Sequence, residues 1–447
     1  MSSMTYKRKY TVKTQLHKKN NQEIIDYFEE GVVLYNHIKR EAFHVYKRDP
    51  DFKKHQFNTY LQEKYNILKR TANSIISDAI GNYNTIKELK EYELKQVDGK
   101  IEKLKKDIIP KLSLFIKQNL QKIYLGMKID LKKHRNLRSK LVAKKKKLHR
   151  LTERKKQLLY EMTSGDFKIC FGTKHLLKRN LVSFRNQRDS QMSFVGCKSE
   201  TCQNQMLQLF YNPNNNQFDI RLRKDLGGYK DKKNYAYGRV YFNHHKNELI
   251  QILKEGYSPL SFKIQKKKGR YYLICTFEIH VEKSAFLTRN SYGTVGVDFN
   301  KGFITITETD AYGNMLSTDK RIYRFKQGNK TVNDFRQLAN ELVKQCLKSG
   351  KDLVIENLNF KKTKSKTESK AGKQYNEMIH SLAYKTFTHI LEEITFRNYV
   401  WLRKVNPAWT SWIAKHKYCP LMKLNVHTGA AYVIARRGQG FKETKIN

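Results

Sequence analysis

Alternating and helical hydrophobic patterns divide the chain into four parts: one strand, a helical tract, a second β-rich part and a mixed end. Residues 6–16 alternate between polar and apolar positions, which predicts a strand. From Gln22 the apolar residues follow the helical repeat, as Ile24, Phe28 and Tyr35 do, and helices continue to about residue 164. Pro110 interrupts this tract, so we expect a helix to kink or end there.

The part after Ser164-Gly165-Asp166 has the short apolar alternation of β structure, broken by turn-rich pieces. The predicted strands are 167–171, 219–223, 238–242, 261–265 and 270–279. With the strand near Tyr10, we expect them to close a small barrel. The helical tract would then be an insertion within the sequence of that barrel.

The last third begins with strands and then alternates helices and strands. The pattern predicts strands at 292–300, 302–307 and 321–325, a helix at 332–347, a strand at 351–357, a helix at 375–396, a strand at 399–405 and a final helix at 426–437. Three strands followed by such an alternation match the ribonuclease H-type α/β layout. The fold class expected for the whole chain is therefore multidomain α+β.

The charge balance indicates a polyanionic partner. The 447 residues carry a net charge of +48 and include 27 Tyr and 23 Phe, which can stack on bases. The end of the helical tract is especially basic, with Lys144, Lys145, Lys146, Lys147, Arg150 and Arg154. A solvated helix face is the ordinary meaning of such a run, but charges of one sign favour phosphate contact.

Cysteine usage and hydropathy indicate a cytoplasmic protein without a membrane segment. The six cysteines are scattered and form no disulfide framework, which is typical of a reducing compartment. Cys197 and Cys202 have no second pair at metal spacing, so a zinc site is not expected. No apolar run approaches ~20 residues, and the first ten residues lack the apolar core of a signal peptide.

Two acidic residues on separate apolar strands are the candidate catalytic groups. Asp298 lies within Val295-Gly-Val-Asp-Phe-Asn300, and Glu356 ends the strand that contains Leu353-Val-Ile355. A carboxylate in a buried strand is costly unless it is compensated, and a divalent cation is the usual compensator. In the expected topology the two strands are neighbours, so both side chains can share a pair of cations that cleaves phosphodiesters.

A third metal ligand should come from the start of the last helix, where no carboxylate occurs. Ala430 and Ala431 would let this helix pack closely on the sheet, which makes His427 the natural ligand. Imidazole is a poorer ligand than carboxylate for Mg²⁺ and suits Mn²⁺ better. A histidine that only forms hydrogen bonds is the alternative, and Asn425 is either a neutral replacement of an acid or an N-cap.

The blocks Gly296-Val-Asp298-Phe-Asn300 and Ile355-Glu-Asn-Leu358 resemble the first two motifs of TnpB, the transposon-encoded RNA-guided RuvC nuclease ancestral to type V CRISPR effectors. Val405-Asn-Pro-Ala-Trp-Thr-Ser411 and Ala430-Ala-Tyr-Val-Ile-Ala-Arg-Arg-Gly438 are similar to later segments of that family. Two departures are clear. Only Cys419 remains where the family has a zinc ribbon, near 411–424, and His427 stands in place of the third Asp.

The resemblance implies a domain plan. Residues 1–20 would give the first strand of a wedge β-barrel, 21–164 a helical recognition domain, 165–288 the rest of the barrel, and 289–447 a RuvC-like nuclease domain. It also implies a guide RNA, a double-stranded DNA target with a short adjacent motif, and a monomeric protein in a ribonucleoprotein. Asp298, Glu356 and His427 would bind Mg²⁺, or Mn²⁺ as an alternative, and cut DNA.

Two other functions stay open on the sequence. One is guided DNA binding without cleavage, and the other is RNA binding without a guide. Arg436 and Arg437 would contact the cut strand or other phosphates, or simply favour the helix macrodipole. The basic loop 361–373 would act as a lid over the substrate, with an unstructured loop as the alternative.

Overall fold

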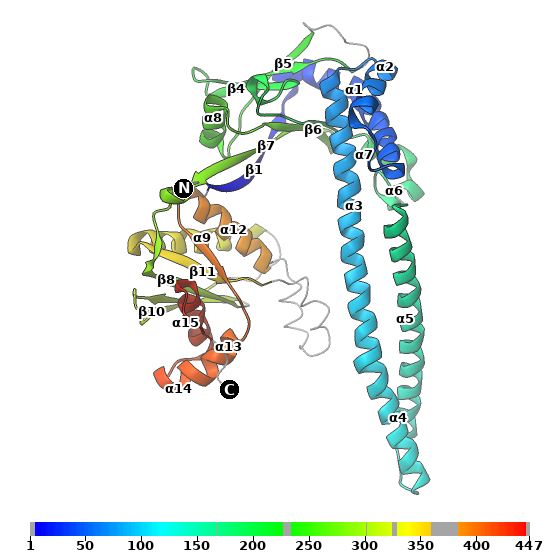
Figure 1. Cartoon of the computed structure of the whole chain (residues 1–447), viewed down its shortest axis with the longest axis vertical. Coiled ribbons are helices and arrows are strands. Elements are labelled where there is room, and N and C mark those ends of the chain that lie inside the picture. The colour runs from blue at the N-terminus through cyan, green and yellow to red at the C-terminus, as the bar shows by residue number, and fades with distance from the viewer. Residues whose placement is uncertain are drawn as a thin grey trace. The chain divides into compact units, whose positions relative to one another are not determined.

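The computed structural model describes residues 5–167, 169–226, 234–300, 302–323, 329–358 and 383–443. It divides into two compact units, one formed by residues 6–280 and the other by residues 1–5 and 281–447. Figure 1 traces both, and each is described by itself. None of the helices described is long and apolar enough to cross a membrane.

Two open sheets and long helices form the unit of residues 6–280. One sheet has the order β1-β7-β6-β2 (Thr5–Leu16, Arg270–Glu282, Ser261–Lys267 and Gln191–Phe194), and the other has the order β3-β4-β5 (Leu207–Asn212, Gln217–Arg223 and Tyr235–Val240). The expected barrel is wrong, because neither sheet closes among the residues described. The expected strand at 167–171 is absent from the described residues there.

Helix α1 (Lys18–Arg48) explains why the sheets stay open. Its apolar face contacts both of them: the Phe28 ring lies edge-on to Tyr271 of β7 at 6.0 Å, and Ile24 lies against Gly238 of β5. A Cβ at Gly238 would lie 2.5 Å from the end of the Ile24 side chain. The helix therefore covers apolar surface that the strands would otherwise bury against each other.

The helical tract of this unit is a long hairpin. Helix α2 (Lys54–Tyr65) leads to α3 (Lys69–Lys103), which passes through a π-turn (Leu104–Ile108) into α4 (Ile109–Tyr124), and α5 (Leu131–Ser164) returns along α3 (Figure 1). Pro110 lies in the first turn of α4, as the sequence indicated, because a proline there needs no N–H partner. Three shorter helices complete the unit: α6 (Lys174–Arg179), α7 (Leu181–Arg188) and α8 (Lys246–Glu255).

The second unit is a five-stranded sheet covered by helices on both faces. Its order is β10-β9-β8-β11-β12 (Met315–Ile322, Phe303–Thr309, Arg289–Asn300, Lys351–Glu356 and Leu402–Val405). Strands β8, β9 and β10 are antiparallel, whereas β11 runs parallel to both β8 and β12. The predicted order of elements is present, although β10 lies earlier than the strand expected at 321–325.

The two faces of this sheet have different covers. Helices α9 (Asn329–Ser349) and α12 (Ala383–Arg397) bury one face, and the fully buried Phe335 and Phe387 pack there against Val295, Val297 and Ile355. Helix α15 (Val426–Gln439) lies on the other face, beside the short helices α13 (Thr410–Ile413) and α14 (Cys419–Met422) and the π-turn (Ala414–Tyr418) between them.

Candidate metal site on the five-stranded sheet

The parallel pairing of β8 and β11 brings the two candidate carboxylates together. Val297 is the register partner of Ile355, so Asp298 and Glu356 are the next residues along the two paired strands. Side chains alternate between the faces of a strand, and Val297 and Ile355 point into the α9/α12 core. Asp298 and Glu356 therefore share the opposite face, the one on which α15 lies.

Helix α15 approaches this face unusually closely. A Cβ at Gly296 would lie 2.4 Å from the backbone oxygen of Ala431 and 2.6 Å from the backbone nitrogen of Ala435, so only glycine fits. The Thr294 hydroxyl donates to the carbonyl of Ala435 at 2.8 Å. The close packing expected from the small residues of this helix is present.

The first turn of α15 places His427 at Asp298. Asn425 is the N-cap, and its side chain accepts a hydrogen bond from the Thr428 N–H at 2.9 Å. Nδ1 of His427 lies 3.2 Å from Oδ2 of Asp298, and its ring meets Phe303 edge-on at 5.2 Å. Half of the histidine side chain, 51%, is exposed, whereas that of Asp298 is 12% exposed.

Burial perturbs both carboxylates, and the charge of Asp298 adds to the effect at Glu356. Burial raises the pKa of Asp298, although hydrogen bonds from Asn300 and His427 oppose this effect. Burial also raises the pKa of Glu356, to about 7, and the charge of Asp298 adds to the rise while Thr410 opposes it. Two neighbouring carboxylates whose charged forms burial disfavours form a site that a cation would stabilise.

The donor set fits a hard divalent cation. Two carboxylates on one face and an adjacent imidazole are ligands that Mg²⁺ and Mn²⁺ accept. Among the residues described, however, no group of three His, Cys, Asp or Glu side chains already has the spacing of a closed metal site. The chemistry of the residues therefore fits the ion, while His427 at present contacts Asp298 rather than a shared centre.

Thr410, which sequence reasoning did not assign to the site, holds Glu356, and Arg437 interacts with it through its charge. The Thr410 hydroxyl donates to Oε1 of Glu356 at 2.6 Å. Burial lowers the pKa of Arg437, and the negative charge of Glu356 opposes this shift. The Arg437 guanidinium donates to the carbonyls of Asn406 and Ala408, in the loop just before Thr410. The only sequence signal was that Thr410 belongs to the Pro-x-x-Thr-Ser segment, whose contact with Glu356 depends on tertiary structure.

A pocket of about 220 Å³ opens beside Glu356. Besides Glu356 and Asn357, Lys385, His389 and Lys404 line it. The Tyr384 hydroxyl, also in its wall, donates to the backbone carbonyl of Glu356 at 2.5 Å. Glu392 also lines this pocket and pairs with Lys404, so the wall beside Glu356 carries both charges.

The predicted nucleic-acid contacts have different surroundings. Lys145, Lys146, Lys147 and Arg150 are exposed on α5, and Lys144 is half-buried there. Arg154 bonds to Glu93 of α3 at 2.7 Å, so an acid of the facing helix neutralises it. The role of these residues as nucleic-acid contacts stays a prediction.

Both arginines at the end of α15 have internal partners. Arg436 donates to Glu443 at 2.6 Å and to the Gly313 carbonyl at 2.8 Å. Arg437 donates to the backbone oxygen of Glu443 at 2.8 Å, besides its bonds to the loop before Thr410. Their hydrogen bonds therefore tie chain segments together, which neither sequence alternative anticipated. The basic loop 361–373 lies outside the described residues.

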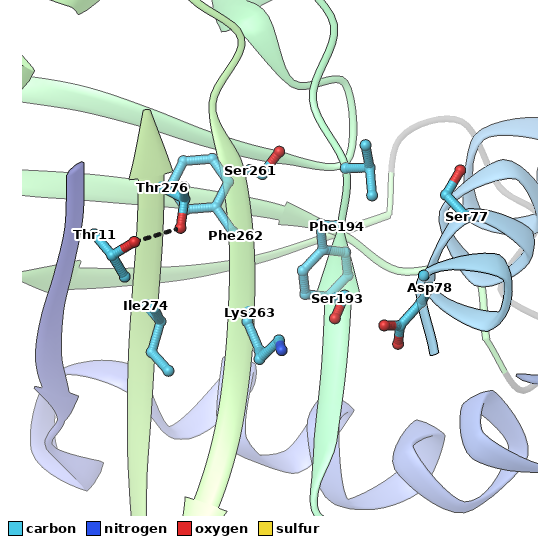
Figure 2. A pocket seen from close by; sticks show the side chains of 12 residues that line it. Thr11, Ser77, Asp78, Ser193, Phe194, Ser261, Phe262, Lys263, Ile274 and Thr276 are labelled. Atoms are coloured by element: carbon cyan, nitrogen blue, oxygen red, sulfur yellow. Dashed lines mark hydrogen bonds between the residues drawn. The ribbon is translucent and has the colours of Figure 1, made fainter. Parts of the chain in front are cut away.

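A separate pocket of about 400 Å³ lies in the other unit, between α3 and the β1-β7-β6-β2 sheet (Figure 2). Figure 2 shows Asp78 and Ser77 facing Ser193 and Phe194 across it, with Lys263 on the adjacent strand. Asp78 is its one carboxylate and already pairs with Lys39 at 3.4 Å. This pocket therefore lacks the paired acids of the sheet site.

Comparisons with known proteins establish neither a family nor an activity for the chain. No family model matches the chain, and no curated protein matches it. Among solved structures, the chain is similar to one in the cryo-EM structure of the Cas12f1–sgRNA–target DNA complex, at 12% identity over 97% of this chain and 99% of that chain. The TM-score is 0.25, so this likeness establishes neither fold nor activity.

Proposed function

We propose that the chain is an RNA-guided DNA endonuclease with a RuvC-type site and a metal-dependent mechanism. The observation that carries the proposal is the convergence of Asp298 and Glu356 on one sheet face, from adjacent parallel strands, with His427 of α15 against Asp298. The motifs quoted above, which resemble TnpB, support the guide RNA and the DNA target as partners. The charge of +48 supports a polyanionic ligand of either kind.

Asp298 and Glu356 would hold the divalent cations, which supply a water nucleophile at neutral pH and stabilise the leaving oxygen when bound. Thr410 fixes Oε1 of Glu356, so the other carboxylate oxygen is directed to the site. His427 would orient Asp298 through Nδ1, and half of its side chain is exposed. Lys385 borders the pocket beside Glu356 and would receive the scissile phosphate, whereas Lys404 pairs with Glu392.

The test begins with the RNA that copurifies with the protein. Sequencing this RNA should give one scaffold followed by variable guide sequence, and a DNA matched to that guide should be cut when Mg²⁺ or Mn²⁺ is added. Asp298→Asn should abolish cleavage and leave RNA binding unchanged. Asp319→Asn, at an exposed acid of β10 in the same unit, is the matched control. Cleavage that survives Asp298→Asn would refute the site.

Guided DNA binding without cleavage is the second candidate. The specific observation in its favour is that the first turn of α15 contains no acidic residue. If His427 serves the metal, His427→Ala should lower cleavage and His427→Asp should retain or raise it with Mg²⁺. If the wild type binds matched DNA without cutting and His427→Asp alone cuts, the protein is a guided binder that lost its third acid. Heterogeneous copurified RNA would instead indicate RNA binding without a guide.

A further inference from the structure

The three-stranded sheet β3-β4-β5 has one buried and one open face. The buried face consists of Leu207, Leu209, Phe218, Ile220, Leu222, Ala236 and Val240, all at most 4% exposed. Helix α1 covers it where Ile24 meets Gly238. The side chains that alternate with these residues belong to the opposite face, where Phe210 is 39% and Tyr237 57% exposed.

The strand register places aromatic and charged side chains of the open face next to one another. Phe210 of β3 is opposite Asp219 of β4, which is opposite Arg239 of β5. In the next row Arg221 of β4 is opposite Tyr237 of β5. Phe210 and Tyr237 are on the outer strands, so about two strand spacings, roughly 10 Å, separate them across the sheet.

The Arg221 guanidinium lies near two rings of this face. Its guanidinium carbon lies 5.3 Å from the centroid of Phe210 and 5.1 Å from that of Tyr235. Its Nε donates to Gln208 at 2.8 Å, which fixes the plane of the group. An arginine fixed in this way offers a planar cation that can stack on a base or contact a phosphate.

We propose that this open face, defined by Phe210, Arg221, Tyr235, Tyr237 and Arg239, binds single-stranded RNA by stacking its bases. Exposed aromatic rings on an open antiparallel sheet can stack any unpaired base, because every base has a π-face. A duplex cannot use the rings in this way, since its bases are already stacked on one another. Arg221 complements the charge of the backbone, whereas Arg239 is paired with Asp219.

Asp219 favours RNA over DNA as the ligand. Its carboxylate is in the middle of the face, 38% exposed, and accepts bonds from Arg239 at 2.8 Å and Asn212 at 3.3 Å. A carboxylate repels phosphate but accepts a hydrogen bond from a hydroxyl, and only RNA has a 2′-OH. This surface is independent of the carboxylates proposed for cleavage, which belong to the other unit.

The experiment uses the full chain and a fluorescein-labelled 12-mer of uridine, U12. Binding is measured at about 0.5 M salt, where the electrostatic share of affinity is weakened. The double variant Phe210→Leu/Tyr237→Leu keeps apolar bulk but removes both rings. It should weaken U12 binding by about tenfold or more and leave a 12-base-pair RNA duplex unaffected. Tyr237→Phe, which keeps the ring, should bind as the wild type does.

Three controls make the outcome decisive. Tyr312→Leu removes an 82% exposed tyrosine of the other unit and should not change U12 binding, and neither should Asp298→Asn. Photocrosslinking of 4-thiouridine-substituted U12 should label peptides that contain 207–212 or 235–240. The proposal is overturned if the double variant binds U12 within twofold of the wild type, if duplex binding falls equally, or if a thymidine 12-mer of DNA binds as tightly as U12.

Discussion

Gly296→Ala tests the approach of α15 to the sheet, on which the geometry of the candidate site depends. The added Cβ would lie 2.4 Å from the oxygen of Ala431 and 2.6 Å from the nitrogen of Ala435. Both are backbone atoms of the helix, so no side-chain rotation can relieve the clash. Either α15 moves away from β8 or the strand is displaced from its neighbours.

The size of the effect follows from these distances. Ordinary contact begins at 3.4 Å, so the helix must retreat by about 1 Å (3.4 minus 2.4). Interiors are densely packed, and overpacking costs typically 1–3 kcal/mol. Because the strained atoms are backbone, we expect about 3 kcal/mol. A misplacement of ~1 Å can also lower a reaction rate by about 100-fold, so cleavage should fall with stability.

Intrinsic fluorescence gives a specific assay. All three tryptophans, Trp401, Trp409 and Trp412, belong to the unit that contains α15, so their emission in a urea titration reports on this unit. The midpoint for Gly296→Ala should shift to lower urea. Gly81→Ala, followed by circular dichroism, is the control: a Cβ there meets nothing within 4 Å, and α3 should gain up to about 1 kcal/mol.

An unchanged urea midpoint for Gly296→Ala would refute the reasoning, because it would mean that α15 does not pack on β8 at this distance. Loss of cleavage with an unchanged midpoint would instead indicate a local role for Gly296. A fall in both quantities supports the proposed dependence of the site on helix position.

Three further predictions concern hydrogen-bond networks. Thr410→Val removes the hydrogen bond to Glu356 and should lower the single-turnover rate of cleavage about tenfold. Thr410→Ser keeps the hydroxyl and should retain the wild-type rate. Glu443→Gln should destabilise its unit by about 3 kcal/mol at pH 7 in urea titrations. Burial raises the pKa of Glu443, but hydrogen bonds from Tyr418, Arg436 and Lys417 outweigh this effect and lower the pKa. The stabilisation that Glu443 gives is therefore present above pH 4.5 and should vanish as the pH falls through the folded-state pKa. Tyr27→Phe should cost about 1–3 kcal/mol, seen as a lower melting temperature in circular dichroism, since its hydroxyl donates to the buried carboxylate of Asp225 at 3.0 Å.

The sequence predicted those parts of the five-stranded sheet that have a strong local pattern. The strands around Asp298 and before Glu356 are covered on both faces, so they contain few polar positions and read as continuous apolar runs. Their adjacency followed from the order of elements. Strand β10 was placed too late because its side chains are mostly exposed, so alternation gave no signal there.

The expected barrel was wrong for a different reason. Strand pairing between distant segments is not encoded in local periodicity, and the apolar faces of both sheets fit a helix as well as another sheet. Helix α1 was predicted, but its contacts with Gly238 and Tyr271 depend on the tertiary arrangement. The hydrogen bond from Thr410 to Glu356 could not be predicted from the sequence, because it too depends on the tertiary arrangement.

Residues 410–424 support α15 by apolar packing. A Cβ at Gly429 would lie 2.9 Å from the Ala414 side chain, and Tyr418 packs edge-on against Tyr432 at 4.8 Å. Glu443 accepts bonds from Tyr418 and from Arg436, which locks the far end of the helix. Since α15 is held along its length, the position of its first turn is fixed independently of any bound ion, and a histidine there can meet Asp298 where a carboxylate would be repelled.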